Sequence, residues 1–392
     1  MLIHMDTERP SPRYSGIDVW DPVEVLDAML GGQFAAVAAV RAARPGLARA
    51  ALAVEARLRE GGRLVYAGAG TSGRLAVQDG AELMPTFGWP RDRLLLFIAG
   101  GEEAMVRAKE GAEDEPGQAI DLVRRHGIAS NDVLIAVAAS GTTPFTLACL
   151  REAKRCSALT LGIANNPGTP LLQEAEHAIF LETGPEPIAG STRMNAGTAQ
   201  RIALSLLSSL VMIRLGKVYA GLMVDVQASN AKLTERRENM LIHLTGSSGE
   251  DVRKALKRAR GSVKLALLLL KGCDLKEAET VLDCAGGQLR GALALVAQDQ
   301  SNARRRTSGE PPRAKHARRH PSAAGPPWRN ILSIRFKHSV PHEFFASVPE
   351  QLIISRASAA SPPSPRPPPQ YAFFTVDYQI NDFVLTEPPT CF

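Results

Sequence analysis

Serine and threonine side chains gather in three short loops of this chain, in a pattern suited to holding a phosphate group. Hydroxyls and backbone N–H groups at a helix N-terminus satisfy phosphate oxygens, and the helix dipole favours the negative charge. An arginine adds a charge-assisted contact. A single loop of this kind is more often an ordinary helix cap, whereas three together favour a phosphate monoester site. The candidate phosphate-binding residues are Gly70, Thr71, Ser72, Ser140, Thr142, Thr143, Ser191, Thr192 and Arg193.

The first loop also fits the dinucleotide fingerprint Gly68-x-Gly70-x-x-Gly73, which is weak evidence when it stands alone. That fingerprint needs an acidic residue about 20 positions on, to hold a ribose. The nearest acids at the end of the next expected strand, Glu102 and Glu103, lie roughly 30 positions past the loop. A nucleotide site is therefore a poor interpretation of these glycines.

Alternating strands and helices are expected to position the loops. Short apolar runs predict strands at residues 63–67, 94–98, 133–137, 159–163 and 177–181. Helices are expected at 47–60, with Pro45 just ahead, at 144–155 and at 197–217. Apolar strands separated by helices indicate an α/β fold, with a parallel sheet covered on both faces. Ligands in such sheets bind at the carboxyl ends of the strands, where the first two hydroxyl loops fall.

The chain divides into four expected parts. Residues 1–46 form an N-terminal arm and helix, 47–233 the α/β domain, and 234–300 a small helical subdomain with helices near 250–260, 262–270, 275–284 and 288–298. Residues 301–392 hold 15 of the 27 prolines, and we expect this tail to be disordered or non-native, apart from a short strand near 371–376, and to take no part in catalysis.

Composition excludes several classes of function. The tail holds 12 Lys and Arg against 6 Asp and Glu, which accounts for the whole net charge of +6, so the neutral body gives no sign of nucleic-acid binding. No apolar run of membrane-spanning length and no signal-peptide core is visible, which predicts a cytoplasmic protein. Five scattered cysteines and widely spaced histidines predict reduced thiols and no metal site. A serine-nucleophile elbow is also missing.

Longer motifs resemble the N-acetylmuramic acid 6-phosphate etherase family, in order, from about Thr7 to Gln298. The resemblance covers the body and none of the tail. It implies a sugar isomerase (SIS) domain, a helical C-terminal piece and a homodimer with active sites near the subunit interface. The stretches that carry it are 64–73, Glu82 with 85–88, 98–102, 110–114, 138–144, 190–194, 196–200, 222–226, Asn230 and 232–233.

The resemblance also implies a reaction that needs no cofactor and no metal. The D-lactyl ether of N-acetylmuramic acid 6-phosphate is eliminated, water adds, and N-acetylglucosamine 6-phosphate and D-lactate result. The family's catalytic glutamate falls on Glu82, expected to protonate the departing lactate and then activate water, and its second glutamate on Glu113, expected to remove the proton at carbon 2. Burial that raises a carboxyl pKa lets one residue act as acid and then base. Without the resemblance, both would be taken as surface carboxylates.

Two departures from the family pattern are visible. Leu83 and Met84 stand in place of Cys-Pro, and Asn195 replaces a lysine, which removes a cation expected near the phosphate site. Two other functions stay open on the same fold: a non-catalytic sugar-phosphate-binding regulator, similar to the glucokinase regulatory protein, and an aldose–ketose isomerase.

Overall fold

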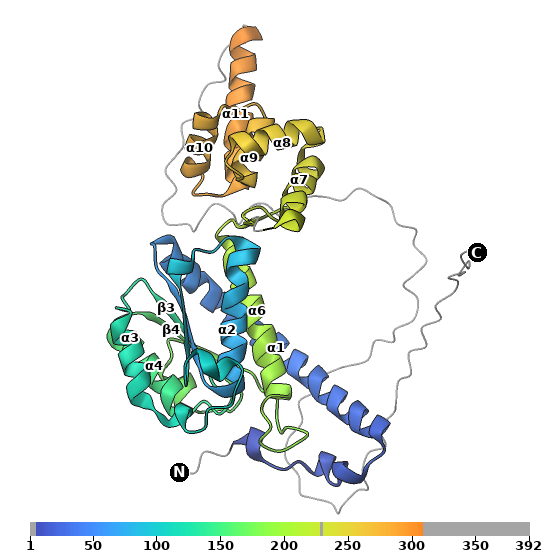
Figure 1. Ribbon diagram of the computed structural model, residues 1–392, viewed down its shortest axis with the longest axis vertical. Coiled ribbons are helices and arrows are strands. Elements are labelled where there is room, and N and C mark those ends of the chain that lie inside the picture. Colours follow the sequence, from blue (N-terminus) through green and yellow to red (C-terminus); the bar gives the residue numbers. More distant parts are fainter. Residues whose placement is uncertain (1–4, 228–229, 309–392) are drawn as a thin grey trace, which may run out of the picture. The chain divides into compact units, whose positions relative to one another are not determined.

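One parallel sheet organises the α/β part of the chain, whose computed structural model describes residues 5–227 and 230–308 (Figure 1). The strand order is β2-β1-β3-β4-β5, and every neighbouring pair is parallel. All five predicted strands are confirmed, with ends within one residue of those expected. They are β1 (Leu64–Gly68), β2 (Leu94–Ile98), β3 (Val133–Val137), β4 (Leu159–Ala164) and β5 (His177–Phe180).

Helices cover both faces of the sheet, as predicted (Figure 1). On β1, Leu64 and Tyr66 belong to one buried cluster, and Val65 and Ala67 to another, because successive side chains of a strand point to opposite faces. The first cluster is completed by α1 (Pro22–Arg59), α2 (Gly70–Phe87) and α6 (Asn195–Arg214). The second is completed by α3 (Pro116–Arg125), α4 (Pro144–Arg155) and α5 (Pro170–Glu174).

The first long helix differs from the expectation. The helix expected at 47–60 is only the second half of α1, which has 38 residues and begins at Pro22, where the Asp21 side chain caps it. The predicted start was wrong because Pro45 was taken as a first-turn proline, whereas it lies inside the helix. Pro45 is exposed, and so is Arg41, whose carbonyl it leaves without a helical N–H donor, so water can satisfy that carbonyl.

A helical subdomain follows a short hairpin of β6 (Val218–Tyr219) and β7 (Leu222–Met223). It holds its own apolar cluster and begins several helices with side-chain caps, including a capping box of Asp274 and Glu277. Its helices are α7 (Ala231–Thr245), α8 (Gly249–Arg258), α9 (Val263–Leu270), α10 (Leu275–Cys284) and α11 (Leu289–Ser308). The boundary expected at residue 300 falls inside α11; the rest of the tail, with the strand expected near 371–376, lies outside the described residues.

Single-turn 3-10 helices complete the described secondary structure. Two of them, Asp6–Glu8 and Ala112–Asp114, each carry a residue that lines the candidate site. The 3-10 helices are Asp6–Glu8, Pro12–Tyr14, Ile17–Val19, Arg91–Arg93, Glu102–Met105 and Ala112–Asp114.

Two of the described helices, α1 and α6, are long and apolar enough to cross a membrane by length and composition alone. In α6, 56% of the apolar window is buried inside the fold, as in a core helix of a soluble protein. In α1 the share is 22%, so most of its apolar window has no partner among the residues that the structure describes.

Candidate active site

The N-terminus of α2 lies directly after β1, at the carboxyl edge of the sheet. Glycines 68 and 73 let strand and helix approach closely: a Cβ atom on Gly73 would lie 2.7 Å from the carbonyl oxygen of Gly68. Ala69 occupies the N-cap and has no side-chain oxygen to offer, so the first N–H groups of α2 stay available to a ligand. The glycine pattern therefore serves strand–helix packing at an uncapped helix N-terminus.

A cavity of about 240 Å³ opens in front of this helix N-terminus. Residues from all three hydroxyl loops meet in it, together with one of the two expected catalytic glutamates. Its lining consists of Glu8, Ala69, Gly70, Thr71, Ser72, Glu113, Ala138, Ala139, Ser140, Thr143 and Thr192. Thr142, Ser191, Arg193 and Glu82 do not line it.

The hydroxyls of the loop after β3 are hydrogen-bonded within the loop, and none of them caps α4. The Ser140 and Thr143 hydroxyls lie 3.2 Å apart, and the Thr142 N–H donates to the Ser140 oxygen over 3.2 Å. Thr143 is the N-cap of α4, yet its side chain makes no capping hydrogen bond. The N-terminus of α4 therefore remains uncapped by a side chain, as at α2, and contributes hydroxyls from a second direction.

The third hydroxyl loop lies before α6, and its helix N-terminus is already occupied. The buried carboxylate of Glu186 accepts hydrogen bonds from the N–H groups of Asn195 (2.8 Å) and Ala196 (2.9 Å). Burial raises the pKa of Glu186, and those two backbone donors oppose the shift. Thr192 reaches the cavity, but α6 offers no anion site like that of α2, because the Glu186 carboxyl group already accepts hydrogen bonds from its first N–H groups.

Asn195, where the resemblance led us to expect a lysine, is directed toward α1 and does not line the cavity. It is 1% exposed, and its Oδ1 accepts a hydrogen bond from Gln33 of α1 over 3.2 Å. A Cβ atom on Gly32 of α1 would lie 2.5 Å from the same oxygen. The side chain at this position therefore packs α6 against α1 in the single chain.

Cations not singled out from the sequence lie beside the cavity. A second cavity of about 240 Å³ shares Gly70, Thr71 and Glu113 with the first and adds Arg74 and Lys109. Arg74 is held in place, because its guanidinium donates to the carbonyls of Ala104 (2.8 Å) and Arg107 (3.2 Å). Positive charge near an uncapped helix N-terminus adds to its attraction for an anion.

The two expected catalytic glutamates are not brought together within one chain. Glu113 lies in the turn Ala112–Asp114 and lines both cavities. Glu82 is exposed on α2, 12 residues past Gly70, which is about 18 Å along the axis at 1.5 Å per residue. A single subunit therefore presents Glu113 to the cavity and Glu82 to the surrounding solvent.

A buried carboxylate lies one helical turn before Glu82. The Tyr66 hydroxyl donates to Asp79 over 3.0 Å, and the Ser208 hydroxyl over 3.2 Å. Burial raises the pKa of Asp79; these two hydrogen bonds and the charge of Arg201 oppose the shift, and the nearby charge of Glu82 adds to it. This cluster joins β1, α2 and α6 beneath the helical turn that carries Glu82.

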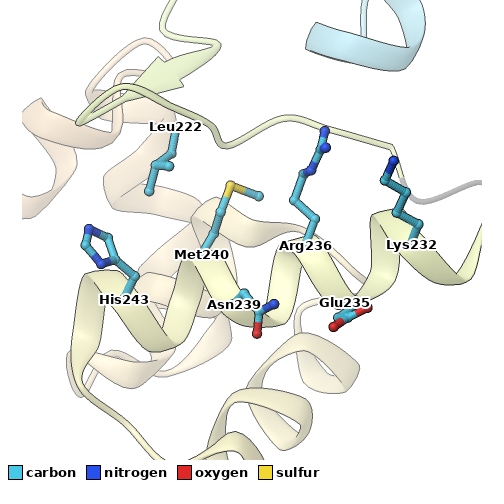
Figure 2. Close-up of a pocket in the computed structure, with 7 residues that line it drawn as sticks. All are labelled: Leu222, Lys232, Glu235, Arg236, Asn239, Met240 and His243. Carbon is cyan, nitrogen blue, oxygen red and sulfur yellow. The ribbon is translucent and has the colours of Figure 1, made fainter. Parts of the chain in front are cut away.

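A larger cavity, of about 380 Å³, lies on the helical subdomain (Figure 2). Figure 2 shows Lys232 and Arg236 extending to the same side of α7 as Met240. None of the residues expected to bind or transform a sugar phosphate lines it. Within the described ranges, no group of three or more His, Cys, Asp or Glu side chains is arranged to hold a metal ion.

Comparison with known protein families first gives the class of domain to which the sheet belongs. Residues 47–154 match the glucokinase regulatory protein N-terminal SIS domain, and residues 116–210 match the SIS domain. The parallel sheet with hydroxyl loops at its carboxyl edge is thus an SIS domain.

Individual relatives give the family. The chain is 50% identical over 288 residues to a Deinococcus radiodurans protein named N-acetylmuramic acid 6-phosphate etherase, covering 73% of this chain and 94% of that one. It is 42% identical over 294 residues to a protein of the same name from Geobacillus thermodenitrificans, covering 75% and 100%. A Streptomyces avermitilis protein of that name is 43% identical over 291 residues, covering 74% and 94%. The chain belongs to the N-acetylmuramic acid 6-phosphate etherase family, which confirms the resemblance.

Proposed function

We propose that this chain is a carbon–oxygen lyase that cleaves the D-lactyl ether of N-acetylmuramic acid 6-phosphate, in the recycling of cell-wall sugar. The membership of the family supports the reaction, and the cavity supports the substrate class. Its hydroxyls and helix N-termini suit a phosphate, and Glu113 beside them suits proton transfer on the attached sugar.

The phosphate binds at the uncapped N-terminus of α2. The N–H groups of the first turn, the hydroxyls of Thr71 and Ser72, and those of Ser140 and Thr143 surround this position. The helix dipole stabilises the phosphate charge by an amount typical of one helix terminus, about 0.3–1 kcal/mol and more where the site is partly buried. Arg193 is exposed and does not line the cavity, so the phosphate contact expected of it is not part of this proposal.

The chemistry proceeds on the opened sugar, whose carbon 1 is an aldehyde. Glu113 removes the proton from carbon 2, and the electron pair forms a double bond to carbon 3 as the carbon–oxygen bond to lactate breaks. Glu82 donates a proton to the departing lactate oxygen. Water then adds to carbon 3 while Glu82 takes back a proton and carbon 2 is reprotonated. Each positioned acid or base contributes typically 10²- to 10⁴-fold.

Glu82 reaches a cavity only if a second subunit supplies it. Apolar side chains that no part of the described single chain covers lie along α1 and α6, consistent with a subunit interface. A homodimer in which α2 of one protomer faces the cavity of its partner would complete the pair of glutamates. The exposed large apolar residues are Val23, Leu26, Leu30, Phe34, Val37 and Leu52 on α1 and Leu206 and Ile213 on α6.

We also propose that the protein works in the cytoplasm and binds neither membrane nor nucleic acid. More than half of the apolar window of α6 is buried in the fold, and the apolar face of α1 is assigned to the subunit interface. The net positive charge of the chain belongs to residues 301–392, and residues 1–300 carry no net charge.

Release of D-lactate from N-acetylmuramic acid 6-phosphate tests the proposal directly. The full-length protein should release lactate and N-acetylglucosamine 6-phosphate in equal amounts. The Glu82→Gln variant should lose activity by about 10²-fold or more while keeping the wild-type melting temperature. The exposed Glu60→Gln variant is the matched control. Folded wild-type protein that releases no lactate would refute the function, and full activity of Glu82→Gln would refute its catalytic role.

Two other functions on this fold would give a different result. A sugar-phosphate-binding regulator, favoured by the match of residues 47–154, would bind the substrate or product without turnover. An aldose–ketose isomerase would exchange the carbon 2 proton of a sugar phosphate without releasing lactate.

A further inference from the structure

The segment before α1 is anchored at the carboxyl edge of the sheet. Thr7 is fully buried; its N–H donates to Asn166 over 3.3 Å, and its hydroxyl accepts from the Asn166 amide over 3.0 Å. The carbonyl of Thr7 accepts a hydrogen bond from the Gly190 N–H over 2.9 Å. Buried polar groups with this many partners hold a fixed geometry, so a residue remote in sequence is fixed beside the cavity.

The next residue, Glu8, is exposed and lines the cavity that Glu113 also lines. Its carboxylate lies against Gly190, where a Cβ atom would come within 2.8 Å of Oε2. Gly190 has φ of +77°, a conformation that favours glycine, so the backbone can pass close to the carboxylate. Across residues 5–227 and 230–308, the structure records no hydrogen bond or ion pair to that carboxylate.

A carboxylate in such a cavity accepts hydrogen bonds and repels anions. The phosphate cannot lie against Glu8, because two negative charges at short range disfavour each other. Hydroxyls and the acetamido N–H of a sugar are the donors that a carboxylate recognises. With the phosphate at the N-terminus of α2, Glu8 is left to face the body of the sugar.

We propose that Glu8 is a specificity-determining residue, which accepts a hydrogen bond from a hydroxyl or the acetamido N–H of the bound sugar. The inference rests on the proposed function and adds a contact to it. Thr7 supplies the anchoring of the segment through its own hydrogen bonds, so the Glu8 carboxylate is not needed for that purpose. No proton transfer is assigned to Glu8.

Two ligands that each contain a phosphate group distinguish the loss of a contact with the sugar from a general disturbance of the cavity. N-acetylglucosamine 6-phosphate carries the sugar hydroxyls and the acetamido N–H, which inorganic phosphate lacks. Glu8→Gln should weaken the binding of N-acetylglucosamine 6-phosphate by about ten- to hundredfold, the usual effect of losing a hydrogen bond to a charged group. Competitive inhibition by inorganic phosphate should be unchanged or slightly tighter, since a negative charge has been removed. In turnover, KM should rise with kcat nearly unchanged.

Asp6→Asn is the matched control, because Asp6 lies in the same helical turn, pairs with Arg9 over 3.4 Å and does not line the cavity. This variant should bind both ligands as the wild type does. Unchanged binding of the sugar phosphate by Glu8→Gln would overturn the proposal, and so would equal weakening of both ligands, which indicates a structural role. Binding of the product is read without turnover, so a wild type that releases no lactate refutes the proposed function separately.

Discussion

At the scale of single residues, the predicted phosphate-binding residues that line the cavity lie mostly in loops that directly follow a strand. Ser72, Ser140 and Thr143 meet in one cavity because the strands before them are parallel and end at one edge. Ser191 and Arg193 were expected there too, but the loop before α6 turns only Thr192 toward the cavity. No pattern of spacing distinguishes these neighbours, because the loop has no helical or strand period.

Glu8 was missed for a different reason. It lies far from the other cavity residues in sequence, and only the long-range hydrogen bonds of Thr7 to Asn166 and Gly190 bring it there. Arg74 and Lys109 are surface cations by type, and only the positions of their loops place them beside the site.

Asp79 gives a prediction about stability and pH. Burial raises its pKa, so the folded protein holds this proton more tightly than the unfolded chain does. The stabilisation is present below the ordinary Asp value of 3.8 and is lost as the pH rises through the folded-state pKa. Asp79→Asn has no such loss, so its Tm relative to the wild type should increase from pH 4 upward. A constant Tm difference between Asp79→Asn and the wild type across this pH range contradicts the argument.

At the scale of elements, the sequence predicts strands more accurately than helix ends. A buried strand is a continuous apolar run, which Val133–Val137 shows clearly. The start of α1 was predicted wrongly because, in the sequence, a proline inside a helix looks the same as a proline in a first turn. At the Leu83-Met84 departure, Leu83 is 2% exposed in the core and α2 continues to Phe87, so the replacement packs the helix without interrupting it.

The close approach of β1 and α2 gives a second prediction. Gly73→Ala places a Cβ atom 2.7 Å from the Gly68 carbonyl, a contact with backbone that side-chain rotation cannot relieve. The overpacking should lower the free energy of unfolding by about 1–3 kcal/mol, measured with urea. It should also raise KM, because α2 carries the proposed phosphate site.

Gly117→Ala is the control within α3, since nothing lies within 4 Å of its Cβ position. The extra methyl group there should stabilise the protein by about 0.5–1 kcal/mol through helix propensity. Equal changes in the free energy of unfolding for the two substitutions would show that the contact between β1 and α2 does not require glycine at position 73.

At the scale of the whole molecule, one chain holds only part of the proposed chemistry. Glu113 faces the cavity, whereas Glu82 is exposed about 18 Å farther along α2 by helix rise. The sequence could not give this separation, because family motifs name residues without saying which subunit supplies them. The relatives match about three quarters of this chain while being covered over 94% to 100% of their length, so the tail lies outside the shared body.

A test by mixing subunits follows from the separation of the two glutamates. Glu82→Gln and Glu113→Gln should each be inactive as pure dimers, because every site lacks one group. In a mixed dimer, one site receives Glu82 from one subunit and Glu113 from the other, and the second site lacks both. Random exchange makes half of the dimers mixed, each with one of two sites intact, so about one quarter of wild-type activity should return.

The control is a mixture of Glu82→Gln with a Glu82→Ala variant, in which no pairing restores a complete site. The activity should grow with the time allowed for subunit exchange, and light scattering should report a dimer throughout. Phe34→Glu, on the exposed apolar face of α1, should shift the protein toward monomer and remove the restored activity with it. If the two inactive variants gain nothing from confirmed exchange, Glu82 and Glu113 do not meet across an interface, and Glu82 cannot be the acid that releases lactate.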